Sequence, residues 1–256
     1  MKYFIDTEQQ TFIVQSEDGP VTEGLYTEAA FEKISQQWMR IGWSLGYYSA
    51  FTWMGQPILQ LPQDLIRLQE TIFLSRPDLI IETGVYKGGS LLYYATLCHA
   101  LGSRGRIIGV DISIPPEVRS AIQEHPLGGL ISLIEGSSTS ADVLEGIKTN
   151  LRPGENVMVV LDSAHTRDHV RCELELYSPF VTPGSFLVVA DGIMQLLADV
   201  PGGNAGWLAD NPALAARDFL AAHPEFMACC PAGLGARGNL GASDTYFTEG
   251  WLQRIR

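Results

Sequence analysis

The residues whose types and spacing are most informative surround a glycine-rich turn, Glu82-Thr83-Gly84-Val85-Tyr86-Lys87-Gly88-Gly89-Ser90. A glycine turn between a strand and a helix lets the backbone approach a ligand closely. A phosphate-binding P-loop has lysine directly after its last glycine, where Ser90 stands here, and a dinucleotide-binding turn needs glycine where Tyr86 stands. Both phosphate-binding interpretations are therefore disfavoured.

Two acidic residues indicate the charge of the ligand. Glu82 ends one short apolar run and Asp111 ends the next. A carboxylate at the first position would repel phosphate and attract a cation, and one at the second can accept both hydroxyls of a ribose. S-adenosylmethionine combines a ribose with a cationic ammonium and sulfonium and has no phosphate. We expect it as the cofactor, bound by Glu82, Gly84, Gly88, Ser90 and Asp111. The alternative is that both acids are solvated strand ends.

A third apolar run ends in the small polar turn Glu135-Gly136-Ser137-Ser138-Thr139. Its side chains suit the edge of an adenine ring, so Ser137 and Ser138 join the expected cofactor site. The turn could equally serve only to cap the next helix.

Asp162 and Asp191 follow the fourth and fifth apolar runs, and His165 stands three residues after the first aspartate. In a doubly wound sheet these strand ends flank the glycine turn, so both carboxylates should face one crevice. Two carboxylates suit Mg²⁺, and we also place Asp162 beside the cofactor. The metal would lower the pKa of a substrate hydroxyl while His165 takes its proton, as methyl transfer from a sulfonium requires. The alternatives are a helix cap at Asp162 and a loop histidine at His165.

A zinc hydrolase is a rival interpretation, because His165 and His169 stand four residues apart near Asp162. The zincin motif has glutamate after its first histidine, and Thr166 takes that position. Ser163 lacks the flanking glycines of a nucleophile elbow.

The elements that must position these residues are five continuous apolar runs that begin 25–28 residues apart, near Asp78, Arg106, Ile131, Asn156 and Gly184. Continuous runs indicate strands covered on both faces, and this spacing fits one strand plus one crossover helix. The sequence therefore predicts an α/β fold with a doubly wound, mostly parallel sheet.

Flanking segments complete the expected organisation. Residues 1–60 form an extension with a helix capped by Thr27, and residues 61–256 form the α/β domain, which opens with a helix after Leu61. Six aromatic residues in 38–53 could line an acceptor pocket, although core or subunit interface is favoured. Segment 193–209 is a candidate lid, Asn211-Pro212 starts a helix, and a glycine-rich stretch, 233–241, precedes a hairpin-like pair around Glu249 and Gly250.

Composition excludes several classes of partner. The chain has 17 Lys and Arg against 29 Asp and Glu, a net charge of −12, which disfavours nucleic acid as a partner. Apolar runs are strand-sized, so we expect no membrane span, and the first residues reach an acid before a signal-peptide core could form. Cys98, Cys172, Cys229 and Cys230 lack metal or disulfide spacing, so we interpret them as reduced core thiols of a cytoplasmic protein.

The motifs together resemble a known family. They are the glycine turn with Glu82, the runs ending in Asp111 and Glu135-Gly136-Ser137-Ser138, Leu161-Asp162-Ser163-Ala164-His165-Thr166, and Glu173-Leu174 followed by Tyr177 and Pro179. Over about residues 53–191, and again at Asp210-Asn211-Pro212, the sequence resembles the cephalosporin hydroxylase / rhamnosyl O-methyltransferase family. The resemblance implies a class I S-adenosylmethionine-dependent methyltransferase fold, Mg²⁺ held by Asp162 and Asp191, and His165 as base.

The resemblance and the residues together predict Mg²⁺-assisted O-methylation of a sugar-like hydroxylated acceptor by a homo-oligomer. Ala190 departs from the family pattern, in which a second acid precedes the last aspartate, so the metal would have fewer protein ligands here. The alternatives are a component of an oxygenase system and a catalytically idle S-adenosylmethionine-binding subunit.

Overall fold

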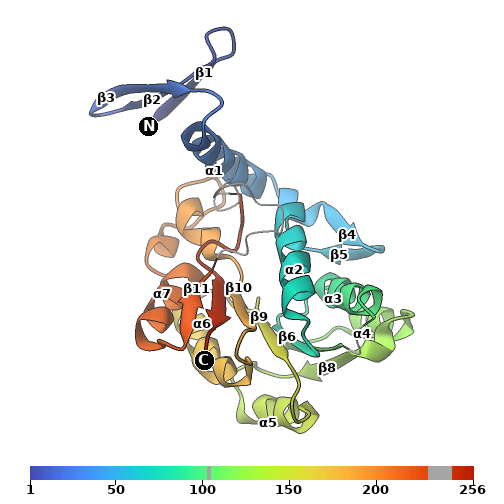
Figure 1. The fold of residues 1–256 in the computed structure, drawn as a ribbon. Coiled ribbons are helices and arrows are strands. Elements are labelled where there is room, and N and C mark those ends of the chain that lie inside the picture. Colours follow the sequence, from blue (N-terminus) through green and yellow to red (C-terminus); the bar gives the residue numbers. More distant parts are fainter. Residues whose placement is uncertain (103–104, 230–243) are drawn as a thin grey trace.

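The computed structural model describes residues 1–102, 105–229 and 244–256, and a seven-stranded sheet forms its centre (Figure 1). The strand order is β11-β12-β10-β9-β6-β7-β8, with bounds β6 Leu79–Thr83, β7 Arg106–Asp111, β8 Ile131–Glu135, β9 Val157–Leu161, β10 Phe186–Val189, β11 Phe226–Ala228 and β12 Trp251–Arg254. Strands β6 to β10 are parallel, and β12 runs antiparallel to both of its neighbours. The five predicted strands and the mostly parallel sheet are confirmed.

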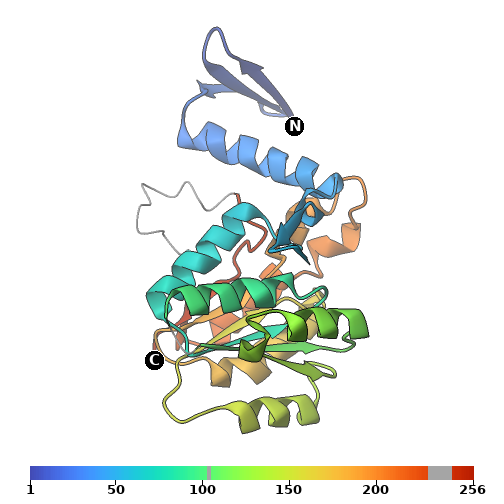
Figure 2. The ribbon, with the colours of Figure 1, turned by 90° about the vertical axis from the view of Figure 1, so that its right-hand side faces the viewer.

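The sheet is covered on both faces (Figure 2), and its central strands β6 and β9 are buried along their whole length. Neighbouring residues of β6 point to opposite sides: Ile80 belongs to one core cluster, and Leu79 and Ile81 belong to the other. The first cluster takes side chains from α2 (Pro62–Ser75), α3 (Gly89–Ala100) and α4 (Pro116–Glu124). The second takes them from α5 (Ala141–Asn150), α6 (Arg167–Tyr177) and α7 (Pro212–Ala222). The fold is therefore doubly wound.

The order of the strands decides where a ligand can bind. From the central β6 the chain proceeds outward through β7 and β8 on one side, and through β9 and β10 on the other. The connections leaving β6 and β9 therefore diverge, and open α/β sheets bind ligands at such a switch point, beyond the carboxyl ends of the strands.

The extension before the sheet holds the expected helix and also strands that the sequence analysis did not include. Helix α1 (Glu28–Ser44) begins at Thr27, whose side chain accepts a hydrogen bond from Ala30 N. Before it, β1 (Lys2–Asp6), β2 (Thr11–Ser16) and β3 (Gly19–Gly24) form an antiparallel sheet that projects from the body at the far end of α1 (Figures 1 and 2). After it come the short 3₁₀ helix Tyr47–Ser49 and a hairpin of β4 (Phe51–Trp53) and β5 (Gln56–Ile58).

Other expected elements form with differences in detail. Helix α2 follows Leu61, and Asn211 caps α7 by accepting from Leu214 N. Segment 193–209 contains two short 3₁₀ helices, Gly192–Leu197 and Ala205–Leu208. The expected hairpin-like pair around Glu249 and Gly250 is wrong, because residues 244–250 contain no strand. Strand β12 begins at Trp251 and pairs with β10 and β11. The glycine-rich stretch, 233–241, lies outside the described residues.

The cysteines differ in their surroundings. Cys98 is buried, as expected of a core thiol, and Cys229 is half-buried. Cys172 is exposed, so its interpretation as a core thiol is wrong: α6 turns Val170, Glu173 and Leu174 toward the sheet and leaves Cys172 on its outer side. Cys230 lies outside the described residues. A search of the described helices finds none with the length and hydropathy that a bilayer crossing requires.

Candidate functional site

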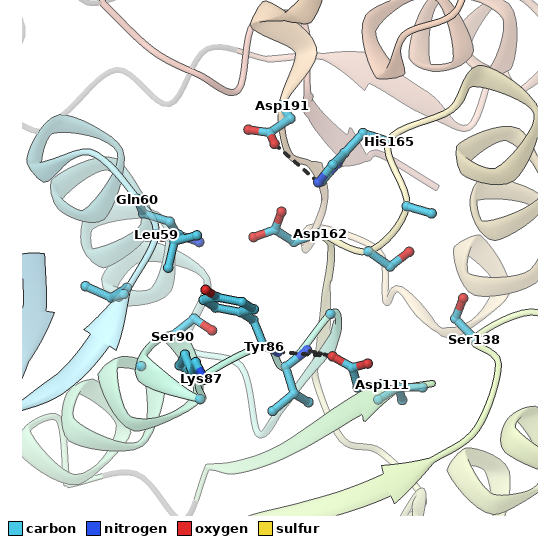
Figure 3. A pocket seen from close by; sticks show the side chains of 18 of the residues that line it. Leu59, Gln60, Tyr86, Lys87, Ser90, Asp111, Ser138, Asp162, His165 and Asp191 are labelled. Atoms are coloured by element: carbon cyan, nitrogen blue, oxygen red, sulfur yellow. Dashed lines mark hydrogen bonds and ion pairs between the residues drawn. The ribbon is translucent and has the colours of Figure 1, made fainter. Parts of the chain in front are cut away.

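A cavity of about 520 Å³ opens at the carboxyl ends of the parallel strands (Figure 3). It lies at the switch point between β6 and β9, where Gly84 and Asp162 follow the two strands. All the predicted site residues except Glu82 line it: Gly84, Gly88, Ser90, Asp111, Ser137, Ser138, Asp162, His165 and Asp191. The fold thus brings to one place residues that span more than 100 positions of the sequence.

The glycine turn lies directly against the end of β9. Gly84 has φ +93°, and a Cβ at this position would lie 1.9 Å from the carbonyl oxygen of Asp162. Gly88 has φ +80° and a Cβ there would lie 2.5 Å from Ile122 Cδ1 of α4. Both positions therefore require glycine, for the backbone angle and for the space. The close approach at Gly84 is what places the turn beside the acidic end of β9.

Asp111 anchors this turn. Its Oδ2 accepts hydrogen bonds from Val85 N at 2.8 Å and Tyr86 N at 3.0 Å, and its Oδ1 accepts from Ser113 N at 3.2 Å. A carboxylate offers about four acceptor sites, of which these amides use three. The sequence analysis assigned Asp111 to the ribose alone and did not foresee that it also fixes the shape of the glycine turn.

Glu82 lies behind the wall of the cavity. It is fully buried, its Oε2 accepts from Ser90 Oγ at 2.6 Å, and its Oε1 accepts from the hydroxyl of Tyr94 at 3.0 Å. Burial, together with the negative charge of Asp162, raises its pKa from 4.5 to about 8. At neutral pH the carboxyl group is therefore mainly protonated, whereas the sequence predicted an anion facing the ligand.

Asp162, His165 and Asp191 form a compact cluster at the other side of the cavity. Each offers one ligand atom, and these atoms all lie within 4.8 Å of one another. His165 Nε2 lies 3.2 Å from Asp191 Oδ2 (Figure 3). Asp191 has a left-handed backbone, φ +56°, which costs energy for a residue with a side chain and turns its carboxylate toward His165.

The charges of this cluster perturb one another. Burial and the neighbouring charge of Asp191 raise the pKa of Asp162 from 3.8 to about 6. Burial by itself would lower the pKa of His165, but the negative charges of Asp191 and Asp162 raise it by more. The pKa of His165 therefore lies above its ordinary value of 6.5. The cluster thus carries more negative charge than its surroundings stabilise, which favours a bound cation.

The donor set fits a divalent metal that prefers oxygen. Two carboxylates from adjacent strand ends suit Mg²⁺, which takes one or two protein carboxylates and fills its remaining positions with water or substrate oxygens. Ala190 precedes Asp191 and is buried, so it contributes a methyl group and no ligand. Asp162 and Asp191 would hold the ion, and His165 offers a ring nitrogen within the same cluster.

His169 belongs to a different group of side chains. Its Nε2 lies 3.2 Å from Ser138 Oγ, 3.1 Å from Ser163 Oγ and 3.4 Å from the buried Glu173 carboxylate. The metal-like cluster found among the described residues does not include it. The spacing of His165 and His169 on which the zinc interpretation rested therefore does not bring the two imidazoles to one ion.

Two polar residues of the cavity wall were missed by the sequence analysis. Gln60 and Tyr246 are each 4% exposed, and the amide of the first and the hydroxyl of the second have no hydrogen-bond partner. Gln60 could have been noticed as a polar residue between Leu59 and Leu61 at the start of a helix. Tyr246 follows the last predicted helix by more than 20 residues, and no local pattern marks it.

Comparisons with known proteins identify relatives of this chain. The rhamnosyl O-methyltransferase of Mycobacterium leprae is 34% identical over 152 residues, covering 57% of this chain and 64% of the relative. That of Mycobacterium bovis is 30% identical over 167 residues, covering 62% of this chain and 66% of the relative. The chain thus spans slightly less than two thirds of the length of these curated relatives.

Solved structures show the fold. A structure of CmcI with Mg and SAM superposes with a TM-score of 0.57 at 20% identity, covering 81% of this chain and 78% of that one. The apo structure of CmcI gives the same TM-score over 81% of this chain and 77% of that one. The fold is that of the class I methyltransferases. The model of the family described as "Rhamnosyl O-methyltransferase/CmcI" matches residues 45–255, and the chain belongs to this family.

Proposed function

We propose that this protein is an S-adenosylmethionine-dependent O-methyltransferase that uses Mg²⁺ and acts on a hydroxyl of a sugar or glycosylated small molecule. The observation that carries the proposal is the Asp162, His165 and Asp191 cluster, which shares one cavity with the glycine turn. Membership of the family and the names of the curated relatives support it.

The two sides of the cavity give the cosubstrate its orientation. Asp111, Ser137 and Ser138 offer polar groups for adenosine on one side, and the charged cluster lies beyond the glycine turn (Figure 3). An adenosine bound at Asp111 directs its sulfonium toward the carboxylates, which favour a cation. The methyl group of the bound cosubstrate would then face the side of the cavity that holds His165.

The reaction is a displacement at carbon. S-adenosylmethionine would supply the methyl group, and Mg²⁺ held by Asp162 and Asp191 would lower the pKa of the acceptor hydroxyl. His165 accepts the hydroxyl proton at Nδ1, the ring nitrogen that does not face Asp191, as the acceptor oxygen bonds to the methyl carbon, and the carbon–sulfur electron pair remains on sulfur. Asp191, 3.2 Å from His165, orients the imidazole and stabilises it once it is protonated.

The acceptor side is built by the extension and the end of the chain. Trp43, Tyr48 and Tyr246 line the cavity, and aromatic faces of this kind suit the apolar faces of sugar rings. Residues 1–60 therefore form the acceptor-side unit of the proposal, and 61–256 form the methyltransferase domain. The proposal also includes that the protein is a cytoplasmic homo-oligomer and that nucleic acid is not one of its partners.

The test is transfer of an isotope-labelled methyl group to a panel of rhamnosides, other glycosides and non-sugar alcohols, with Mg²⁺ or with excess chelator. We expect S-adenosylhomocysteine and a methylated glycoside in equal amounts, with the yield falling on chelation and returning on addition of Mg²⁺. Binding of the cosubstrate without turnover on any acceptor would indicate an idle subunit. Product formation that requires oxygen and a reductase would indicate a hydroxylase component.

A further inference from the structure

Gln60 is a buried polar side chain of the cavity wall that offers both hydrogen-bond donors and an acceptor. It is 4% exposed, and neither Oε1 nor Nε2 has a hydrogen-bond partner. A buried amide left unpaired costs free energy, so such groups in native proteins are normally satisfied. Because Gln60 lines the cavity, a ligand within it can provide the missing partners.

The backbone on either side holds Gln60 in place. Its neighbours Ile58 and Leu61 are buried in the core, and α2 begins immediately afterwards. The carbonyl oxygen of Pro57 lies so close to Gly89 that a Cβ there would come within 2.2 Å of it. The segment is thus fixed against the start of α3, and Gln60 presents its amide from a rigid support.

The position of Gln60 differs from that of the adenosine side. In Figure 3, Gln60 faces Asp162 from the side of Ser90 and Lys87, and Asp111 and Ser138 lie on the opposite side. Gln60 therefore lies next to Asp162, and its amide makes no hydrogen bond of normal geometry to that carboxyl group.

The side chains at the Gln60 side of the cavity suit a zwitterionic ligand. Lys87 is the only lysine or arginine among the described residues that line the cavity, so a carboxylate would meet its complementary charge here. A primary amide offers both donors and an acceptor, as an ammonium paired with a carboxylate requires. In the orientation proposed above, the adenosine of the cosubstrate lies at Asp111. Its amino-acid tail is then the part left to occupy the Gln60 side of the cavity.

We propose that Gln60 binds the amino-acid head of S-adenosylmethionine, with Nε2 donating to its carboxylate and Oε1 accepting from its ammonium. The inference rests on the proposed function and adds to it the residue that reads the end of the cosubstrate farthest from the adenine. It makes Gln60 a specificity residue, because adenosine derivatives without the amino-acid head leave its amide unpaired.

The experiment compares two ligands that differ in this head. S-adenosylhomocysteine carries it, and 5′-methylthioadenosine shares the adenosine and thioether but lacks it. Calorimetric titration of the full chain with each ligand gives two affinities for the wild type, for Gln60→Leu and for Gln63→Leu. Gln63 is the matched control, because it undergoes the same change three residues later and does not line the cavity.

We expect Gln60→Leu to lower the affinity for S-adenosylhomocysteine about 10-fold or more, because hydrogen bonds to charged groups are lost. The affinity for 5′-methylthioadenosine should change less than about twofold. Gln63→Leu should change neither. The melting temperature of ligand-free Gln60→Leu should equal or exceed that of the wild type, since an unpaired buried amide is removed.

Equal loss for both ligands, or no loss for either, would overturn the assignment of Gln60. A lower melting temperature of the free variant, with both affinities reduced, would show that Gln60 supports the fold instead. Failure of the wild type to bind either ligand is a different outcome, which refutes the proposed function itself.

Discussion

The buried carboxyl group of Glu82 makes the stability of this protein depend on pH in a direction that can be measured. Its pKa is raised from 4.5 to about 8 by burial and by the charge of Asp162. The folded protein therefore keeps a proton on Glu82 between these pH values, and the unfolded chain does not. Where the native state binds more protons, stability falls as pH rises, so the loss runs from about pH 4.5 to about pH 8.

The magnitude follows from the same numbers. The pKa rises by about 3.5, and each pKa unit is worth about 1.36 kcal/mol. The free energy of unfolding should therefore fall by about 5 kcal/mol across that pH range. Glu82→Gln keeps the size of the side chain and its ability to bond with the hydroxyls of Ser90 and Tyr94, and it cannot ionise. The variant should therefore match the wild type within about 1 kcal/mol at pH 4.5 and exceed its stability by about 2–5 kcal/mol at pH 8.5.

Urea denaturation at several pH values, without ligand, measures this difference. Glu135→Gln is the matched control, because Glu135 also ends a strand of the sheet and its side chain is 50% exposed. The stability gained by Glu82→Gln between pH 4.5 and pH 8.5 should exceed any change that the control shows over the same range. A Glu82→Gln variant whose stability runs parallel to that of the wild type from pH 4.5 to 8.5 would refute the reasoning, since it would show that Glu82 ionises in the native state as easily as in water.

The other predictions concern the site. His165→Ala should lower turnover about 10²–10⁴-fold and leave the affinity for S-adenosylhomocysteine nearly unchanged, and a large loss of affinity would instead make His165 structural. Gly84→Ala places a Cβ 1.9 Å from the carbonyl oxygen of Asp162 and should destabilise the protein by about 2–4 kcal/mol in thermal or urea unfolding. Gly154→Ala, at φ +80° with no atom within 4 Å, should cost only about 1 kcal/mol, and equal costs would disprove the close approach. Asp111→Ala should weaken S-adenosylhomocysteine about 10-fold or more in calorimetry, and unchanged affinity would remove Asp111 from the cosubstrate site.

The central sheet could be predicted from the sequence because its strands are buried on both faces. The whole of β6 and β9 is apolar up to the polar residues at their ends, and such runs stand out at a regular spacing. The strands β1 to β3 of the N-terminal extension contain no continuous apolar run of this kind. In β2 only Phe12 and Val14 are buried, and β1 and β3 are largely exposed, so their apolar residues are scattered along the segment.

The site was predicted in its residue types but not in its contacts. Strand order alone places Asp162 and Asp191 together, because parallel strands end at one edge of the sheet. The buried Glu82 carboxyl group accepts a hydrogen bond from the hydroxyl of Tyr94, which helix α3 brings to the end of β6. Gln60 and Tyr246 reach the cavity only through long-range packing at the start of α2, where Asp64 accepts from Tyr246 N at 2.9 Å. Contacts of this kind leave no local pattern in a sequence.

The central claim is that the cavity binds an adenosine carrying a sulfur cation and no phosphate. Calorimetric titration of the wild-type protein, with Mg²⁺ present, by S-adenosylmethionine and separately by ATP tests it most directly. The account predicts saturable heat with S-adenosylmethionine and none with ATP. Saturable binding of ATP, with no heat from S-adenosylmethionine, would contradict it.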